Sequence, residues 1–242
     1  MSSYSQTRGC GMVEYMNQQL KDPVFAREYE KNQAKFREAF TQRLNVNNRN
    51  FNRRTPIIIP VAVHFPEAQE SDRACLEALA QNQIDILNAD YTATNADANL
   101  WSTASSFYPG VNPGMAAVEF CIATQNHPVG IGGGLTENGP AVTIGYNFGN
   151  GGDQDPNWSG YMNFLVKDIG PGLLGFSPLG GSISAGQSVV MNLSAFGSGP
   201  GCSTSGIVPG APYDLGRTVT HELGHFYNLD HLWGGGGGCN LD

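Results

Sequence analysis

The chain has 242 residues, of which 40% are hydrophobic and 14% are charged. This is enough apolar material for one sizeable domain with an appendage. No apolar run reaches the length that spans a membrane, and the amino terminus lacks the apolar core of a signal peptide. These features argue against a membrane protein, and we expect any export signal to have been removed from this sequence or replaced.

The net charge of -8 is unevenly distributed along the chain. Residues 1–54 contain ten of the thirteen basic side chains and five acids, whereas residues 55–242 contain three basic and sixteen acidic side chains. Only two of the 32 glycines precede residue 55. We predict a basic segment, residues 1–54, that docks on an acidic domain, residues 55–242. The alternative is a nucleic-acid-binding tail, but basic and acidic residues are interleaved along the segment.

The basic segment is predicted to form helices over residues 11–20 and 23–44. Asp22 before Pro23 is typical of a helix start, because the carboxylate can cap free N–H groups and Pro fits the first turn. An apolar stripe at helical spacing is predicted to pack on the acidic domain, and it comprises Phe25, Tyr29, Phe36, Phe40 and Leu44.

A polar loop is predicted over residues 45–52, and Arg53 and Arg54 follow it directly. An exposed dibasic pair between two segments is a natural site for activation by proteolysis. The alternative is an ordinary linker that carries two charges.

The acidic domain alternates predicted strands with helices. Strands are expected at residues 57–65, 117–123, 141–146, 161–168, 173–179 and 189–193. A helix capped by Ser71 is predicted to run to about residue 89. The last helix is predicted to lie in the Pro-free stretch that starts at residue 217 and to end at Asn228. This order predicts an α/β fold in which the sheet has a backing helix and a separate active-site helix.

The last predicted helix contains the motif that points to a function. His221 and His225 are one turn apart, so both imidazoles lie on one face and can reach one ion. Glu222 can take a proton from a water on that ion. His231 can supply a third nitrogen after a sharp turn, for which a left-handed Asn228 is the candidate. Three protein ligands with an open fourth position are typical of a catalytic zinc site.

Two alternatives compete with a catalytic zinc site. A surface helix with solvated histidines accounts for His221 and His225 but not for His231. A closed structural zinc site needs a fourth ligand, for which Cys239 is the nearest candidate, and it leaves Glu222 without a role. The other two histidines, His64 and His127, are predicted to be structural or exposed.

The sequence of residues 215–235, LGRTVTHELGHFYNLDHLWGG, resembles the pappalysin family of the metzincin clan of zinc endopeptidases, in particular its ulilysin-like and mirolysin-like members. Residues 160–180 and 188–198 resemble the strands before the zinc helix of that family. Residues 8–24 resemble its pro-segment. The resemblance implies a metzincin-like twisted, mixed sheet preceded by a mostly helical pro-segment. It also implies a secreted zinc endopeptidase that cleaves proteins or peptides, made as a latent zymogen and inhibited by its own pro-segment. It implies no nucleic-acid or membrane partner.

The resemblance assigns a role to several residues. Glu222 would be the general base, and His221, His225 and His231 the zinc ligands. Cys10 would be the cysteine switch, whose thiolate blocks the zinc until cleavage at Arg53 or Arg54; a disulfide-bonded or idle Cys10 is the alternative. The antiparallel edge strand that binds an extended substrate would include Leu173, Leu174, Gly175 and Phe176.

The five cysteines leave the disulfide pattern open. A disulfide between Cys75 and Cys121 is a candidate, because one lies on a predicted helix and the other on a predicted strand. Cys202 either pairs with Cys239 or is free. By resemblance, calcium is a candidate cofactor besides zinc, although only the acids of residues 151–156 offer themselves and no EF-hand-like loop is present.

All six methionines precede residue 192, whereas metzincins have a Met-containing turn after the third histidine. The resemblance therefore implies that the Met turn and the carboxy-terminal subdomain are largely absent from this chain. The alternatives to an active peptidase are an inactive truncated fragment and a non-catalytic zinc-binding or adhesion module.

Overall fold

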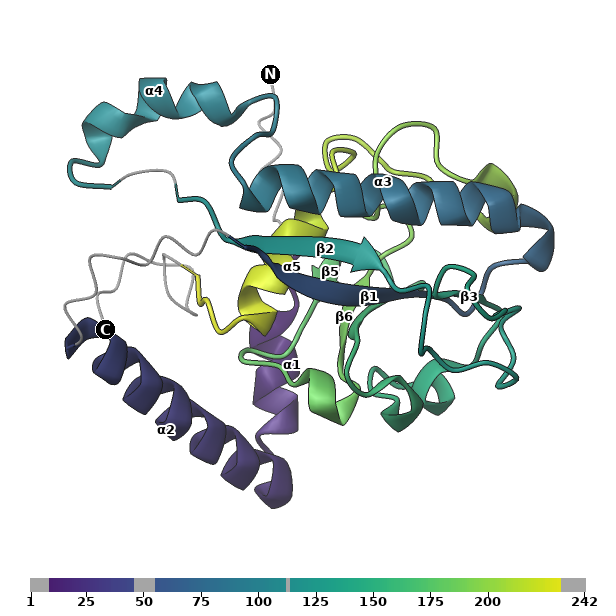
Figure 1. The fold of residues 1–242 in the computed structure, drawn as a ribbon, viewed down its shortest axis with the longest axis horizontal. Helices are drawn as coiled ribbons and strands as arrows, with labels where there is room; N and C mark the ends of the chain where they lie inside the picture. The colour runs from purple at the N-terminus through teal and green to yellow at the C-terminus, as the bar shows by residue number, and fades with distance from the viewer. Residues whose placement is uncertain (1–8, 46–54, 112–113, 232–242) are drawn as a thin grey trace.

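The computed structural model describes residues 9–45, 55–111 and 114–231 (Figure 1). A six-stranded sheet forms its centre, and the strands are β1 (Ile57–Phe65), β2 (Val118–Ile122), β3 (Val142–Ile144), β4 (Met162–Val166), β5 (Gly175–Phe176) and β6 (Ser188–Met191). The strand order is β2-β1-β4-β6-β5, and β3 pairs with the end of β1. Only β5 is antiparallel to its neighbour. The predicted α/β fold with a mixed sheet is confirmed.

The described residues also form five α-helices, namely α1 (Met12–Gln19), α2 (Pro23–Asn45), α3 (Arg73–Tyr91), α4 (Trp101–Ala104) and α5 (Arg217–Phe226). Figure 1 shows α3 lying along the sheet, as predicted for the backing helix. No described helix is both long enough and apolar enough to cross a bilayer.

The central strands are buried on both faces, so their side chains pack alternately into two separate hydrophobic cores, one on each face of the sheet. Val61, Val63 and Phe65 of β1 pack with α3 and α5, and the main core on this face also contains Phe120, Phe164 and Met191. The intervening Ala62 points to the opposite face, where a smaller core includes Phe148, Trp158, Leu165 and Val190. The alternation fixes which face of the sheet the last helix can cover.

His64 lies in the smaller core and is fully buried. Its Nδ1 is 2.9 Å from Thr143 Oγ1, its Nε2 is 3.2 Å from Asn163 Oδ1, and its ring packs between Phe148 and Trp158. Burial lowers the pKa of His64 to about 3, despite the opposing contact with Asn163. The prediction of a structural histidine is therefore confirmed.

Both disulfide predictions are wrong, the Cys75–Cys121 pair and the prediction that Cys202 pairs with Cys239 or is free. Cys75 is bonded to Cys202, and Cys121 carries a free thiol. The fold explains the error, because α3 begins beyond the carboxy-terminal end of β1 whereas Cys121 lies opposite Pro60, nearer its start. Cys202 reaches Cys75 with a Cα–Cα distance of 5.9 Å, and Cys239 lies outside the described residues.

The helix starts were predicted with mixed success. Asp22 caps α2, since Val24 N donates to its Oδ1 at 2.8 Å. Ser71 does not cap α3; it lies in a short 3-10 turn that precedes Arg73.

The predicted apolar stripe of α2 packs only over its first half. Phe25 and Tyr29 are half-buried, whereas Phe36 and Phe40 are 46% and 55% exposed and stack on each other. The side chain of Leu44 is not among the described ones. Figure 1 shows the reason, because α2 runs away from the sheet instead of along it.

We predict that replacing His64 with Asn makes stability less sensitive to acid. The ring stays neutral in the folded chain but binds a proton near pH 6.5 once unfolded, so its contribution is complete above that pH and is lost as the pH falls toward 3. Urea unfolding of the metal-free chain at about pH 7 and about pH 5 should show a loss roughly 2 kcal/mol larger for wild type than for His64→Asn. Equal losses would contradict the assignment.

Candidate metal centre

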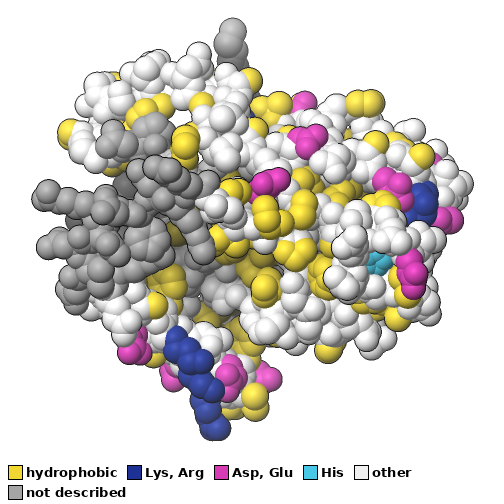
Figure 2. All heavy atoms as spheres, in the orientation of Figure 1, with side chains coloured by type: hydrophobic (Ala, Val, Ile, Leu, Met, Phe, Trp, Pro, Cys, Tyr) yellow, Lys and Arg dark blue, Asp and Glu magenta, His cyan; other side chains and the backbone are white. Residues whose placement is uncertain are grey.

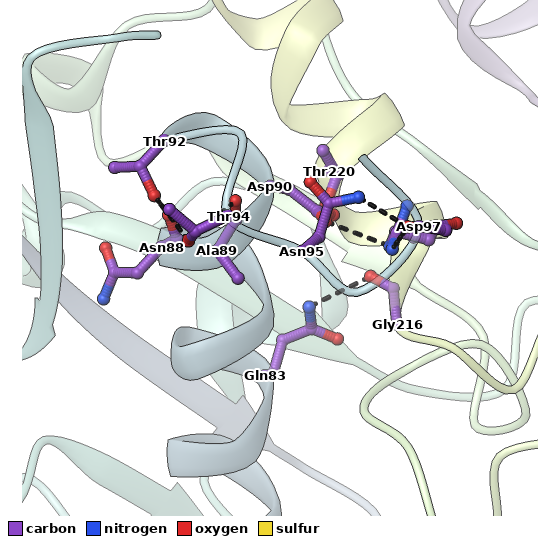
Figure 3. A network of polar contacts seen from close by, with 11 residues as sticks. Gln83, Asn88, Ala89, Asp90, Thr92, Thr94, Asn95, Asp97, Gly216 and Thr220 are labelled. Carbon is purple, nitrogen blue, oxygen red and sulfur yellow. Dashed lines mark hydrogen bonds and ion pairs between the residues drawn. The ribbon is translucent and has the colours of Figure 1, made fainter. Parts of the chain in front are cut away.

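Helix α5 is held in place by the face that does not carry the motif. Its apolar side chains at helical spacing are buried in the main core, and they are Val219, Leu223 and Phe226. The helix starts after Gly216, whose φ of 68° suits glycine and whose carbonyl accepts a hydrogen bond of 3.0 Å from Gln83 Nε2 (Figure 3). Packing of one face therefore fixes the direction of His221 and His225 on the other.

The chain reverses directly after α5, as the sequence predicted. Asn228 has a φ of 69°, and its N–H donates to the His225 carbonyl at 2.8 Å. Leu229 N donates to the Gly224 carbonyl at 3.0 Å. A left-handed residue that closes the last turn in this way is a common helix terminator. It directs the following residues back along the helix, so that His231 meets the other two histidines.

The three imidazoles converge through their Nε2 atoms. The separations are 3.1 Å between His225 and His221, 3.1 Å between His225 and His231, and 3.3 Å between His231 and His221. Cys10 Sγ lies 3.5 Å from His225 Nε2, and all four donor atoms are within 4.8 Å of one another. The structure thus gathers the three predicted ligands and the predicted switch residue at one point.

This spacing matches tetrahedral zinc. Bonds of about 2.0–2.1 Å to nitrogen and about 2.3 Å to sulfur separate neighbouring nitrogens by roughly 3.3 Å and nitrogen from sulfur by roughly 3.5 Å. His225 is also fixed in orientation, because its Nδ1 is 2.6 Å from the Leu229 carbonyl. With Nδ1 donating to that carbonyl, Nε2 presents its lone pair to the centre, as a metal ligand must.

Glu222 lies beside this cluster and is fully buried. Its Oε2 is 3.7 Å from the Cys10 thiol, while its Oε1 has no hydrogen-bond partner among the described residues. Burial raises the pKa of Glu222 to about 8, partly offset by the thiol contact. Burial and the Glu222 charge raise the pKa of Cys10 to about 12. A divalent cation would reverse both shifts, because it favours thiolate and carboxylate.

Cys10 reaches the cluster along the edge of the sheet. Leu174 N donates to the Gly9 carbonyl at 2.8 Å, and Gly11 N donates to the Gly175 carbonyl at 2.9 Å, so the segment pairs in parallel with β5. A side chain at Gly9 would lie 1.8 Å from the Gly172 carbonyl oxygen, which explains glycine there. β5 is an edge strand as predicted, but it covers only Gly175–Phe176 of the predicted residues 173–179.

The described acids of residues 151–156 form no cluster of ligands that could hold the calcium ion suggested by the resemblance. In the loop at residues 151–156, the Asp155 carboxylate is occupied by hydrogen bonds that it accepts from Tyr146 Oη, Gly149 N and Asn157 N. Burial would raise the pKa of Asp155, but these hydrogen bonds hold it below its usual value. Among the described residues, Cys10 and the three histidines are the only grouped set of three or more His, Cys, Asp or Glu ligands.

A hydrogen bond and ion pairs, which the sequence analysis did not predict, connect the start of α5 to Asp90 of α3 and to Asp97 (Figure 3). Thr220 Oγ1 donates to Asp90 Oδ2 at 2.6 Å, and Arg217 Nε lies 3.0 Å from Asp90 Oδ1. Arg217 Nη2 also donates to Asp97 at 2.7 Å. The Asp90 side chain is only 6% exposed, and burial raises its pKa despite Thr220 and Arg217. Because Thr220 precedes His221, this network fixes the first ligand of the cluster.

An open cleft of about 650 Å³ adjoins the cluster. Its lining includes the three histidines, Asp90, Tyr91 and Met115. The ligands are therefore accessible from a space large enough for a substrate side chain.

A mixed sheet, a backing helix and a buried HExxH helix with a third histidine after a left-handed turn together give the described chain a metzincin-like fold around a candidate metal centre. No protein-family profile matches the sequence. The chain is 26% identical over 187 residues to extracellular metalloprotease 1 of Coccidioides posadasii, covering 75% of this chain and 54% of that protein. It is 26% identical over 199 residues to an extracellular metalloprotease of Verticillium alfalfae, covering 80% and 59%.

Solved structures of metalloproteases also resemble the chain. A mutant of Tannerella forsythia promirolysin matches with a TM-score of 0.62 and 25% identity, covering 94% of this chain and 71% of that chain. Mature mirolysin in complex with a cleaved peptide matches with a TM-score of 0.55 and 27% identity, covering 76% and 67%. The resemblance to mirolysin-like metzincins is confirmed. The chain spans about half the length of the curated relatives it matches.

We predict that Thr220→Val destabilises the chain, since it leaves the buried Asp90 carboxylate short of a donor. The free energy of unfolding should fall by about 1–3 kcal/mol. Thr220→Ser is the matched control, because it keeps the hydroxyl and should stay close to wild type. Urea unfolding of the three chains gives the comparison, and equal values for the Val and Ser variants would show that the hydroxyl contributes nothing.

Proposed function

We propose that this chain is a zinc-dependent endopeptidase in latent form. The observation that carries the proposal is the convergence of four donor atoms within 4.8 Å beside the buried Glu222 carboxylate. A solvated surface helix would bury neither His225 nor Glu222. The similarity to proteins named as extracellular metalloproteases supports both the reaction class and a secreted location.

In this proposal His221, His225 and His231 hold the zinc. When bound, the ion supplies Lewis-acid activation of a water and of the scissile carbonyl. Glu222 accepts the proton of the attacking water on a carboxylate oxygen and then delivers it to the leaving amine nitrogen. Its Oε1 has no hydrogen-bond partner among the described residues and can receive that proton, while a bound cation would keep the carboxyl ionised beforehand.

Substrates are proposed to be proteins or peptides that bind in extended form. The edge of β5, with Leu173, Leu174, Gly175 and Phe176, offers main-chain groups next to the cluster. An extended peptide can add a strand there. The described structure already contains such an added strand, residues 9–11, which occupies the same edge.

Latency is proposed to reside in residues 1–54, with residues 55–242 as the catalytic part. Cys10 would provide the fourth zinc ligand and so occupy the position that a water needs. The promirolysin structure matches 94% of this chain and the mature one 76%, a difference of 18% that is close in size to the basic segment. Activation is proposed to follow cleavage at Arg53 or Arg54, which lie outside the described residues.

We predict that Glu222→Gln abolishes cleavage but leaves zinc binding intact. Gln has nearly the same shape but cannot accept the proton, and loss of a general base typically lowers rates by about 10²–10⁴-fold. The assay is casein digestion after removal of residues 1–54, with zinc content measured by atomic absorption. Undiminished digestion by the variant would refute the role of Glu222. One zinc per chain without turnover in the wild type would favour a binding module instead.

We predict that Cys10→Ala speeds activation. The variant lacks the sulfur that competes with water for the metal, although residues 9–11 still pair with β5, so hydrolysis of a fluorogenic peptide should start after a shorter lag than in wild type. Cys121→Ala is the matched control, because Cys121 is the other free thiol and lies on β2, away from the cluster. If both variants show the same lag as wild type, Cys10 does not enforce latency.

A further inference from the structure

We propose that Gln33 of α2 is a positioning residue for the metal centre, acting through Asn228. Through this contact the basic segment would help to retain the metal, independently of the Cys10 sulfur. This inference rests on the proposed zinc site.

The contact is a reciprocal pair of side-chain amides. Gln33 Nε2 donates to Asn228 Oδ1 at 2.6 Å, and Asn228 Nδ2 donates to Gln33 Oε1 at 3.1 Å, across 195 residues of sequence. Each amide uses its donor and its acceptor on the same partner, which satisfies both groups in a partly buried place. Gly180 leaves room for the pair, because a Cβ there would lie 2.8 Å from Asn228 Oδ1 and 3.0 Å from Gln33 Nε2.

Asn228 is the residue on which the third ligand depends. It reverses the chain between His225 and His231, and its φ of 69° lies in the left-handed region that few residues other than Gly and Asn adopt. The same turn places the Leu229 carbonyl that orients the His225 ring. A hydrogen-bonded partner on the Asn228 amide therefore stabilises the geometry of two ligands at once.

Among the α2 residues whose side chains are described, Gln33 is the last that faces the domain. The half-buried positions of the helix are Phe25, Ala26, Tyr29 and Gln33, which follow helical spacing, and residues 34–42 are all exposed. The amide pair thus ends the contact stripe directly at the metal-binding turn. If the turn is better ordered while α2 is docked, a metal held by His231 should leave more slowly, since anything that favours the bound conformation also favours the metal.

The experiment measures zinc loss from the full chain in a Cys10→Ala background, which removes the direct sulfur contact. Zinc-loaded protein is mixed with an excess of a chromogenic chelator, and the rate of colour formation is recorded. Gln33→Leu should speed zinc loss by about five- to tenfold, the effect expected for one or two lost hydrogen bonds. Gln42→Leu is the matched control on the same helix, because Gln42 is exposed and bonds to Glu38.

A double-mutant cycle tests whether Gln33 acts through Asn228. In an Asn228→Gly background, which keeps the left-handed turn, Gln33→Leu should cause no further change in the rate. Equal rates for Gln33→Leu and Gln42→Leu, or an undiminished effect in the Asn228→Gly background, would overturn the inference. A wild-type chain that binds no zinc would instead refute the proposed metal centre.

Discussion

The burial of one face of α5 is the constraint on which the rest of the site depends. Val219, Leu223 and Phe226 are almost inaccessible to solvent, and each fully buried apolar side chain of this kind contributes about 1.5–3 kcal/mol. Rotation of the helix about its axis would expose them. His221 and His225 are therefore fixed in direction by residues that take no part in the chemistry, and Asn228 then returns the chain with His231.

The chemistry of the cluster follows from the burial of Glu222 and Cys10, which makes their ionised forms costly. Three imidazole nitrogens, a thiol and a carboxyl meet beside the cleft, and burial disfavours the ionised forms of the carboxyl and the thiol. The raised pKa values of Glu222 and Cys10 express that cost. A divalent cation is the simplest partner that satisfies all of them, because it binds the nitrogens and stabilises both anions.

The sequence predicted what depends on local patterns and failed where distant segments meet. The HExxH spacing, the left-handed Asn228 and the strands with apolar runs are local, since they follow from helical or strand periodicity. The Cys75–Cys202 disulfide depends on which end of α3 meets which loop, and no periodic pattern encodes that. The Asp90–Thr220 and Gln33–Asn228 contacts join residues 130 and 195 positions apart, so each looks like an ordinary polar surface residue in the sequence.

The docking of the basic segment illustrates the same limit. The opposite net charges of residues 1–54 and 55–242 predicted electrostatic docking, yet every described ion pair lies within one part or the other. Contacts of another kind join the two parts, and they include main-chain pairing of Gly9 and Gly11 with β5, stacking of Tyr15 on Phe176 at 5.1 Å, and the Gln33–Asn228 amide pair. Long-range charge can speed association, but these short contacts fix the register. That register is what delivers Cys10 to the metal ligands, because a shift by one residue along β5 would turn its side chain to the opposite face.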